Sequence, residues 1–121
     1  VVSYEYWTAA GWQRSADGAV PVMSGQVGEL SVQYNAFLGK WVAMHLDEQR
    51  TAIVLRTAPS LTGPWTGGEV VAHGRDHPGL YGGFQHPDSG ADLYFAMSEW
   101  QPYHVQLMKL PLWPLKEATN K

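Results

Sequence analysis

The sequence predicts an all-β fold of short antiparallel strands, and three observations support this fold class. Aromatic residues and turn formers are both abundant, with 6 Trp, 6 Tyr, 13 Gly and 8 Pro in 121 residues. Apolar residues recur with a spacing closer to two residues than to 3.6, and Gly or Pro interrupts each candidate helical window. No segment is therefore predicted as a helix, and we expect helix in less than about a tenth of the chain. Short motifs also repeat at a spacing typical of β-propeller blades.

The expected strands follow one another along the whole chain. Residues 3–7 are rich in aromatic side chains, and residues 11–15 precede the turn signal Asp17-Gly18. Residues 29–34 alternate apolar and polar side chains, as in a half-buried strand, and the loop 35–39 joins them to a strand at 40–46. Further strands are expected at 51–57, 69–73, 81–85, 92–98 and 103–110, separated by polar or Gly/Pro-rich turns such as 61–65.

An internal repeat groups these strands into larger units. The motif Trp-Val-Ala-Met at 41–44 matches Tyr-Phe-Ala-Met at 94–97, 53 residues later, and Val54 to Arg56 fall on Leu107 to Lys109 at the same spacing. Trp12 and Trp65 are also 53 residues apart. In this frame residues 1–27 hold the outer strands of one blade, 28–75 a full four-stranded blade, 76–113 three strands of the next blade, and 114–121 a polar C-terminal tail.

The number of blades has a consequence for completeness. A propeller needs at least about four blades to close, and this chain holds about two. We therefore expect a fragment of a propeller, with the remaining blades in the same protein or in another chain, since an open apolar edge is otherwise exposed. A small sandwich of nine or ten strands is the alternative architecture.

Several segments resemble one known family. They are Gly-Glu-Leu-Ser-Val-Gln-Tyr-Asn at 28–35, Leu-Thr-Gly-Pro-Trp at 61–65, Tyr-Gly-Gly-Phe-Gln-His-Pro at 81–87 and Leu-Tyr-Phe-Ala-Met-Ser-Glu-Trp at 93–100. Together they resemble the C-terminal half of domain of unknown function 4185, a bacterial family associated with endo-D-arabinanases. The resemblance implies a five-bladed β-propeller, carboxylate catalysis at the central axis, arabinan-type cell-wall polysaccharide as substrate, and a secreted or cell-envelope location. The resemblance further implies that essential carboxylates lie on earlier blades, so that part of the site would be outside this chain.

Glycoside hydrolysis normally uses two carboxyl groups, one as acid and one as base or nucleophile. Glu29 is the candidate catalytic residue, because it opens an expected innermost strand; a solvent-facing strand residue is the alternative. Its catalytic partner is expected outside this chain. Glu99, at the end of another strand, is interpreted as a turn carboxylate.

Tyr81, Gly82 and His86 are candidate substrate-binding residues, since the strand 81–85 is expected to enter the axis of the next blade. We expect Glu29, Tyr81 and His86 to lie around one cleft, although His86 could instead have a structural role.

Arg56, Trp100 and Tyr103 complete the candidate substrate-binding set. Arg56 stands in an apolar run, where a buried guanidinium would need a carboxylate such as Glu29; an exposed edge position is equally open. The rings of Trp100 and Tyr103 could rim the channel and pack on a furanose, although packing within the core is the usual role of such rings.

Other functional classes are disfavoured by the sequence. The net charge is −3 and no basic block is present, which argues against nucleic-acid binding. The sequence contains no apolar run of about 18 residues, so no membrane span is predicted. Cysteine is absent and the histidines lack a zinc-type spacing, so we expect neither metal nor cofactor. A non-catalytic carbohydrate-binding domain and a purely structural or interaction domain remain as alternatives to a hydrolase.

Overall fold

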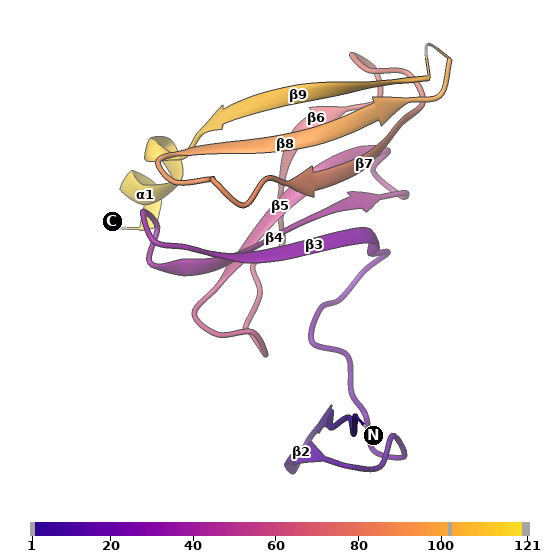
Figure 1. The fold of residues 1–121 in the computed structure, drawn as a ribbon, viewed down its shortest axis with the longest axis vertical. Coiled ribbons are helices and arrows are strands. Elements are labelled where there is room, and N and C mark those ends of the chain that lie inside the picture. The colour runs from indigo at the N-terminus through magenta and orange to yellow at the C-terminus, as the bar shows by residue number, and fades with distance from the viewer. Residues whose placement is uncertain (1, 102, 120–121) are drawn as a thin grey trace.

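A computed structural model describes residues 2–101 and 103–119 (Figure 1). The described residues form three antiparallel sheets and one short helix, so the all-β prediction is confirmed. The first sheet is a two-stranded hairpin of β1 (Tyr6–Thr8) and β2 (Gly11–Gln13). The second has the order β3 (Gly28–Asn35), β4 (Lys40–Asp47), β5 (Ala52–Ala58) and β6 (Glu69–His73). The third has the order β7 (Leu80–Gln85), β8 (Asp92–Glu99) and β9 (His104–Pro111).

Each strand expected from the alternation of side chains is present, with shifts at the ends. The C-terminal tail is a correction, because α1 (Trp113–Thr119) lies where no helix was expected. Leu112, which is fully buried, and the partly buried Leu115 fix this segment to the core, and the ammonium of Lys116 lies 4.3 Å from the centre of the Phe37 ring. Tertiary contacts therefore stabilise a helix too short to be stable alone.

The hydrophobic core lies between the four-stranded and the three-stranded sheets. Alternate residues of the central strands face it, including Met44 of β4, Leu55 of β5, and Phe95 and Met97 of β8. Each of these side chains is at most 2% exposed. Strand β3 packs beside β7, so the first strand of one sheet neighbours the first strand of the next (Figure 1).

The 53-residue repeat does not superpose the two sheets as successive blades. It pairs Val42 with Phe95 and Met44 with Met97, yet all four side chains belong to the core between the sheets. In blades related by rotation about an axis, one side chain of an equivalent pair faces the core between the two blades and the other faces away from it. A shift of one residue along a strand moves a side chain to the opposite face. A spacing of 52 residues, which pairs Ala43 with Phe95, is the register that such a rotation would require of β4 and β8.

Candidate functional site

A row of polar side chains on β3 bonds to the backbone of β7. The N–H of Gly82 donates to the Glu29 carboxylate, the N–H of Gln85 donates to Ser31 Oγ at 3.1 Å, and Gln33 Nε2 donates to the Gln85 carbonyl at 3.0 Å. Ser31 and Gln33 are two apart on the strand and therefore face the same side. Side chains of β3 thus satisfy the edge of β7 that does not pair with β8.

Glu29 owes its position to a β-bulge. The pairing of β3 with β4 shifts register between Gly28 and Ser31, and Glu29 has a φ of 51°, in the left-handed region. This conformation is uncommon for a residue with a side chain, and strained backbone of this kind occurs often at functional sites. The residue is exposed, so its carboxylate is open to solvent while it accepts the bond from Gly82.

Three aromatic rings lie near one another and form a surface that we call the aromatic shelf: Tyr81, Trp100 and Tyr103. The ring centres of Tyr81 and Trp100 are 5.9 Å apart, and those of Trp100 and Tyr103 are 6.1 Å apart. Trp100 is 65% exposed and Tyr103 is 73% exposed. The structure thus brings Glu29 to Gly82 and groups Tyr81, which directly precedes Gly82, with Trp100 and Tyr103.

A tight turn positions the central ring of the shelf. Gly79 has a φ of 71°, and its carbonyl accepts a hydrogen bond from the Trp100 N–H at 3.0 Å. A Cβ atom at position 79 would lie 3.1 Å from the Cβ of Trp100. Glycine is therefore required here both by its backbone conformation and by the close approach of the tryptophan.

Glu99 has a different partner from the one expected for a turn residue. Its Oε1 lies 3.0 Å from Nδ1 of His77, and both side chains are partly buried. Sequence reasoning missed His77 because the two residues are 22 apart and only the pairing of Leu80 with Glu99 brings them together.

His86 lies away from this group of residues. It follows the last residue of β7, five positions after Tyr81, which corresponds to about 15 Å along an extended strand. Its Nδ1 accepts a hydrogen bond from the Asp88 N–H at 3.2 Å, so the ring stabilises the turn in which it lies. The expectation that Glu29, Tyr81 and His86 share one cleft is thus wrong for His86, because strand length separates the two ends of β7.

Arg56 is buried rather than at an exposed edge, with 4% of its surface accessible. Its Nε donates to Nε2 of His45 at 3.1 Å, and not to Glu29 as expected. Nδ1 of His45 lies 3.0 Å from the Leu46 carbonyl, which identifies Nδ1 as the protonated nitrogen of a neutral ring. Burial, and then the charge of Arg56, lower the pKa of His45. The register that pairs Ala43 with Arg56 makes His45 its diagonal neighbour on one face of the sheet.

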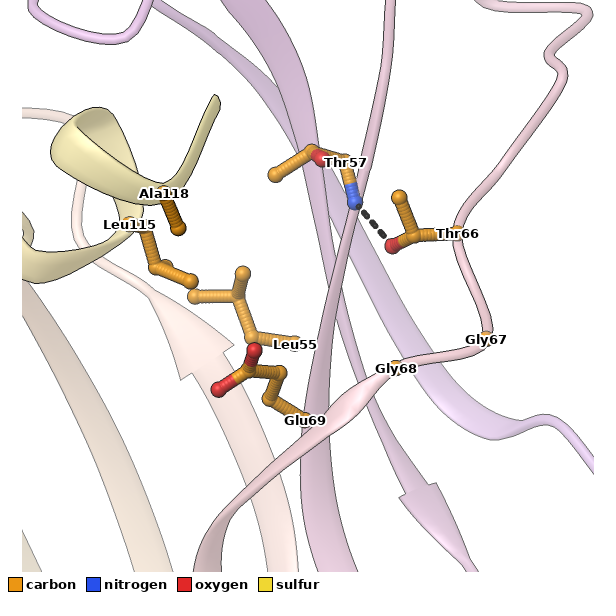
Figure 2. A pocket seen from close by; sticks show the side chains of 8 residues that line it. All are labelled: Leu55, Thr57, Thr66, Gly67, Gly68, Glu69, Leu115 and Ala118. Atoms are coloured by element: carbon orange, nitrogen blue, oxygen red, sulfur yellow. Dashed lines mark hydrogen bonds between the residues drawn. The ribbon is translucent and has the colours of Figure 1, made fainter. Parts of the chain in front are cut away.

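A separate hollow lies between β5, β6 and α1 (Figure 2). Leu115 and Ala118 of α1 face Leu55 across it, and the Thr57 N–H donates to Thr66 Oγ1 at 3.0 Å. None of the candidate site residues lines this hollow. Within residues 2–101 and 103–119 we find no group of three or more His, Asp or Glu side chains arranged to hold a metal ion. Over the same residues, no helix has the length and apolar character needed to cross a membrane.

Comparisons with known proteins identify the family. No curated protein matches the chain. A family model described as a domain of unknown function, DUF4185, matches residues 1–109, which include the aromatic shelf, Glu29 and Arg56. Because the match covers most of the sequence, the chain belongs to the DUF4185 family.

Proposed function

We propose that this chain forms part of a glycoside hydrolase-like protein that binds a polysaccharide at the aromatic shelf. The observation that carries the proposal is the cluster of three neighbouring rings, two of them mostly exposed, of which Tyr81 directly precedes the glycine that bonds to the exposed carboxylate of Glu29. A cluster of exposed aromatic rings commonly marks a binding surface. Ring faces of Trp and Tyr pack on the apolar faces of sugars, while their polar atoms stay hydrated.

Glu29 supplies the chemistry in this proposal. A glycosidase needs one carboxyl group to protonate the leaving oxygen and a second one to act as base or nucleophile. The bond from the Gly82 N–H fixes the Glu29 carboxylate at β7, one residue from Tyr81 of the shelf. The carboxylate of Glu99 bonds to His77, so we assign the second carboxyl group to residues outside this chain.

The architecture proposed for the complete protein is a five-bladed β-propeller. Two features support it: β3 to β6 pair in chain order, as in a propeller blade, and the following strand, β7, packs beside β3. The remaining blades would lie in the same protein or in another chain. An arabinan-type cell-wall substrate and a secreted or cell-envelope location follow from the family resemblance.

A non-catalytic carbohydrate-binding domain is the second candidate function. It is favoured by the row on β3, in which Glu29 bonds to β7 in the same way as Ser31 and Gln33 do. In that case Glu29 would stabilise the contact between two sheets, and the shelf alone would hold the sugar.

Binding is tested with the protein that contains this chain and with soluble D-arabinan, by titration calorimetry. Trp100→Ala removes the central ring of the shelf and should weaken binding about tenfold, as for the loss of one stacked ring. Trp113→Ala is the matched control, because Trp113 is a comparably exposed tryptophan on α1. Equal affinities of the two variants would exclude the shelf as the binding surface.

Catalysis is tested with Glu29→Gln, which keeps an oxygen to accept the Gly82 N–H and removes the negative charge. The hydrolase proposal requires that release of reducing ends falls by at least about a hundredfold while affinity for arabinan is retained. Unchanged hydrolysis would exclude Glu29 as a catalytic residue. If the unaltered protein binds arabinan without cleaving it, the non-catalytic function is the correct one.

A further inference from the structure

A hollow of about 300 Å³ lies at the start of β3, apart from the hollow beside α1. It is lined by the segment that enters the strand and by one residue of the turn after β4: Gln26, Val27, Gly28 and Glu48. Gly28 directly precedes Glu29, whose carboxylate bonds to β7 one residue from Tyr81 of the aromatic shelf. The hollow is therefore joined through Glu29 to the strand that carries the first ring of the shelf.

Strand pairing and a braced turn fix the walls of this hollow. Gly28 pairs with Leu46, so the segment before β3 lies beside the turn that follows β4. In that turn, Asp47 Oδ1 accepts the backbone N–H of Arg50 at 3.1 Å and Oδ2 accepts its Nε–H at 2.7 Å. The backbone that carries Glu48 is thus held in place before a ligand binds, which lowers the cost of ordering the site.

The two polar side chains of the hollow are available to a ligand. Gln26 and Glu48 are exposed, and within residues 2–101 and 103–119 neither side chain forms a hydrogen bond or an ion pair with the protein. The amide of Gln26 can donate and accept hydrogen bonds, whereas the carboxylate of Glu48 only accepts them. A hydroxyl group, which is both donor and acceptor, can bond to either side chain.

The charge and size of the hollow restrict the ligand further. Among the described residues, no arginine or lysine lines it, while Glu48 does and Glu29 follows Gly28 directly. These carboxylates repel a uronate, sulfate or phosphate group, so the hollow favours a neutral ligand. A volume of about 300 Å³ is at the lower end for ligand sites and suits a single small ring.

We propose that this hollow is a second subsite for the polysaccharide, which holds one neutral sugar unit while neighbouring units pack on the aromatic shelf. The inference rests on the proposed function and adds a place for a further sugar unit. Hydroxyl groups of that unit donate to the Glu48 carboxylate and accept from the Gln26 amide. A sugar chain that spans both surfaces passes the carboxylate of Glu29, which links them.

The test measures how affinity depends on the length of the sugar chain. The protein that contains this chain is titrated calorimetrically with a size series of linear D-arabinan oligosaccharides, in the Glu29→Gln background so that the ligand is not cleaved. Short oligosaccharides, which fill only the shelf, should bind equally well when Glu48→Ala or Gln26→Ala is added. Longer ones should bind about tenfold more weakly after Glu48→Ala and about threefold more weakly after Gln26→Ala, because a charged acceptor contributes more than a neutral amide.

Two further variants separate this effect from a general one. Glu48→Gln keeps an acceptor oxygen and should recover part of the affinity that Glu48→Ala loses. Glu117→Ala is the matched control, because Glu117 is an exposed carboxylate on α1, at the opposite end of the strands from the start of β3 (Figure 1). It should leave the affinity unchanged at every length. All of these side chains are exposed, so an unchanged Tm should show that weaker binding is not a folding defect.

The outcomes distinguish failure of the subsite from failure of the proposed function. If Glu48→Ala and Gln26→Ala leave the affinity for long oligosaccharides unchanged, or weaken short and long ones equally, the subsite is wrong and the shelf is unaffected. If Glu48→Gln in the otherwise unaltered protein lowers hydrolysis about a hundredfold with affinity retained, Glu48 is a catalytic residue and the subsite assignment is wrong. Absence of binding at every length, before Glu48 or Gln26 is changed, would overturn the proposed function and the subsite together.

Discussion

Buried polar groups have different partners on the two faces of the four-stranded sheet. On the face toward β7, neutral side chains of Ser31 and Gln33 are paired one by one with backbone groups of the neighbouring sheet. On the other face, a charged side chain, Arg56, is buried against a neutral histidine. The first arrangement is complete within the chain, and the second leaves a charge without a counterion among the described residues. Complete pairing marks a structural contact, whereas a buried charge without a counterion is costly for the folded chain to keep.

The largest expected loss of stability is for a substitution on the side of the sheet toward β7. Gln85 is buried, and its Nε2 donates to the carbonyls of Ser31 at 3.1 Å and Val42 at 3.0 Å. Gln85→Leu removes both donors from buried carbonyls and should lower the free energy of unfolding by about 3 kcal/mol. Urea denaturation measures this loss, and Gln106→Leu, on the same sheet but with an exposed hydrogen bond, should cost less than about 1 kcal/mol. Equal losses would contradict the view that the paired side is the structural one.

On the face that contains Arg56, removing the polar groups should not lower the stability and could raise it. Replacing Arg56 and His45 together, as Arg56→Met with His45→Leu, removes a buried charge and the acceptor that would otherwise be left without a donor. The double variant should be as stable as the unaltered chain or more stable by about 1–2 kcal/mol, again by urea denaturation. Arg56→Met alone should be less stable than the double variant, because Nε2 of His45 then remains buried and unpaired. A loss above about 3 kcal/mol in the double variant would show that the charge is already compensated.

The sequence predicts this contrast only in part, and the reasons are geometric. Alternation within single strands located β3 to β9, since that pattern depends on the strand alone. The contact of Glu29 with the Tyr81-Gly82 segment also followed, because both open the first strand of a sheet. The pairs His45–Arg56 and His77–Glu99 did not follow, because they depend on strand register. Helix α1 was missed because contacts with the core, and not its own residues, stabilise it.

A smaller effect is expected on the pH dependence of stability. The pKa of His45 in the folded chain is lowered from 6.5 by burial and by the charge of Arg56. The unfolded chain therefore binds more protons, so stability should be full above pH 6.5 and should fall as the pH decreases from 6.5 toward the lowered pKa. Thermal unfolding between pH 7.5 and about pH 5 measures this slope. His45→Gln should reduce the slope, and an unchanged slope would mean that another group is responsible.

The smallest effect on stability should come from the aromatic shelf, and its smallness is informative. Trp100 is 65% exposed and contacts the rings of Tyr81 and Tyr103, so Trp100→Ala should change the free energy of unfolding by no more than about 0.5 kcal/mol. Urea denaturation of this variant is therefore the companion to the arabinan titration. A ring that costs little to remove from the folded chain but much to remove from the complex belongs to a binding surface. A decrease of 2 kcal/mol or more in the free energy of unfolding would show that the three rings pack for stability. The shelf would then have a structural role, as the contacts between β3 and β7 do.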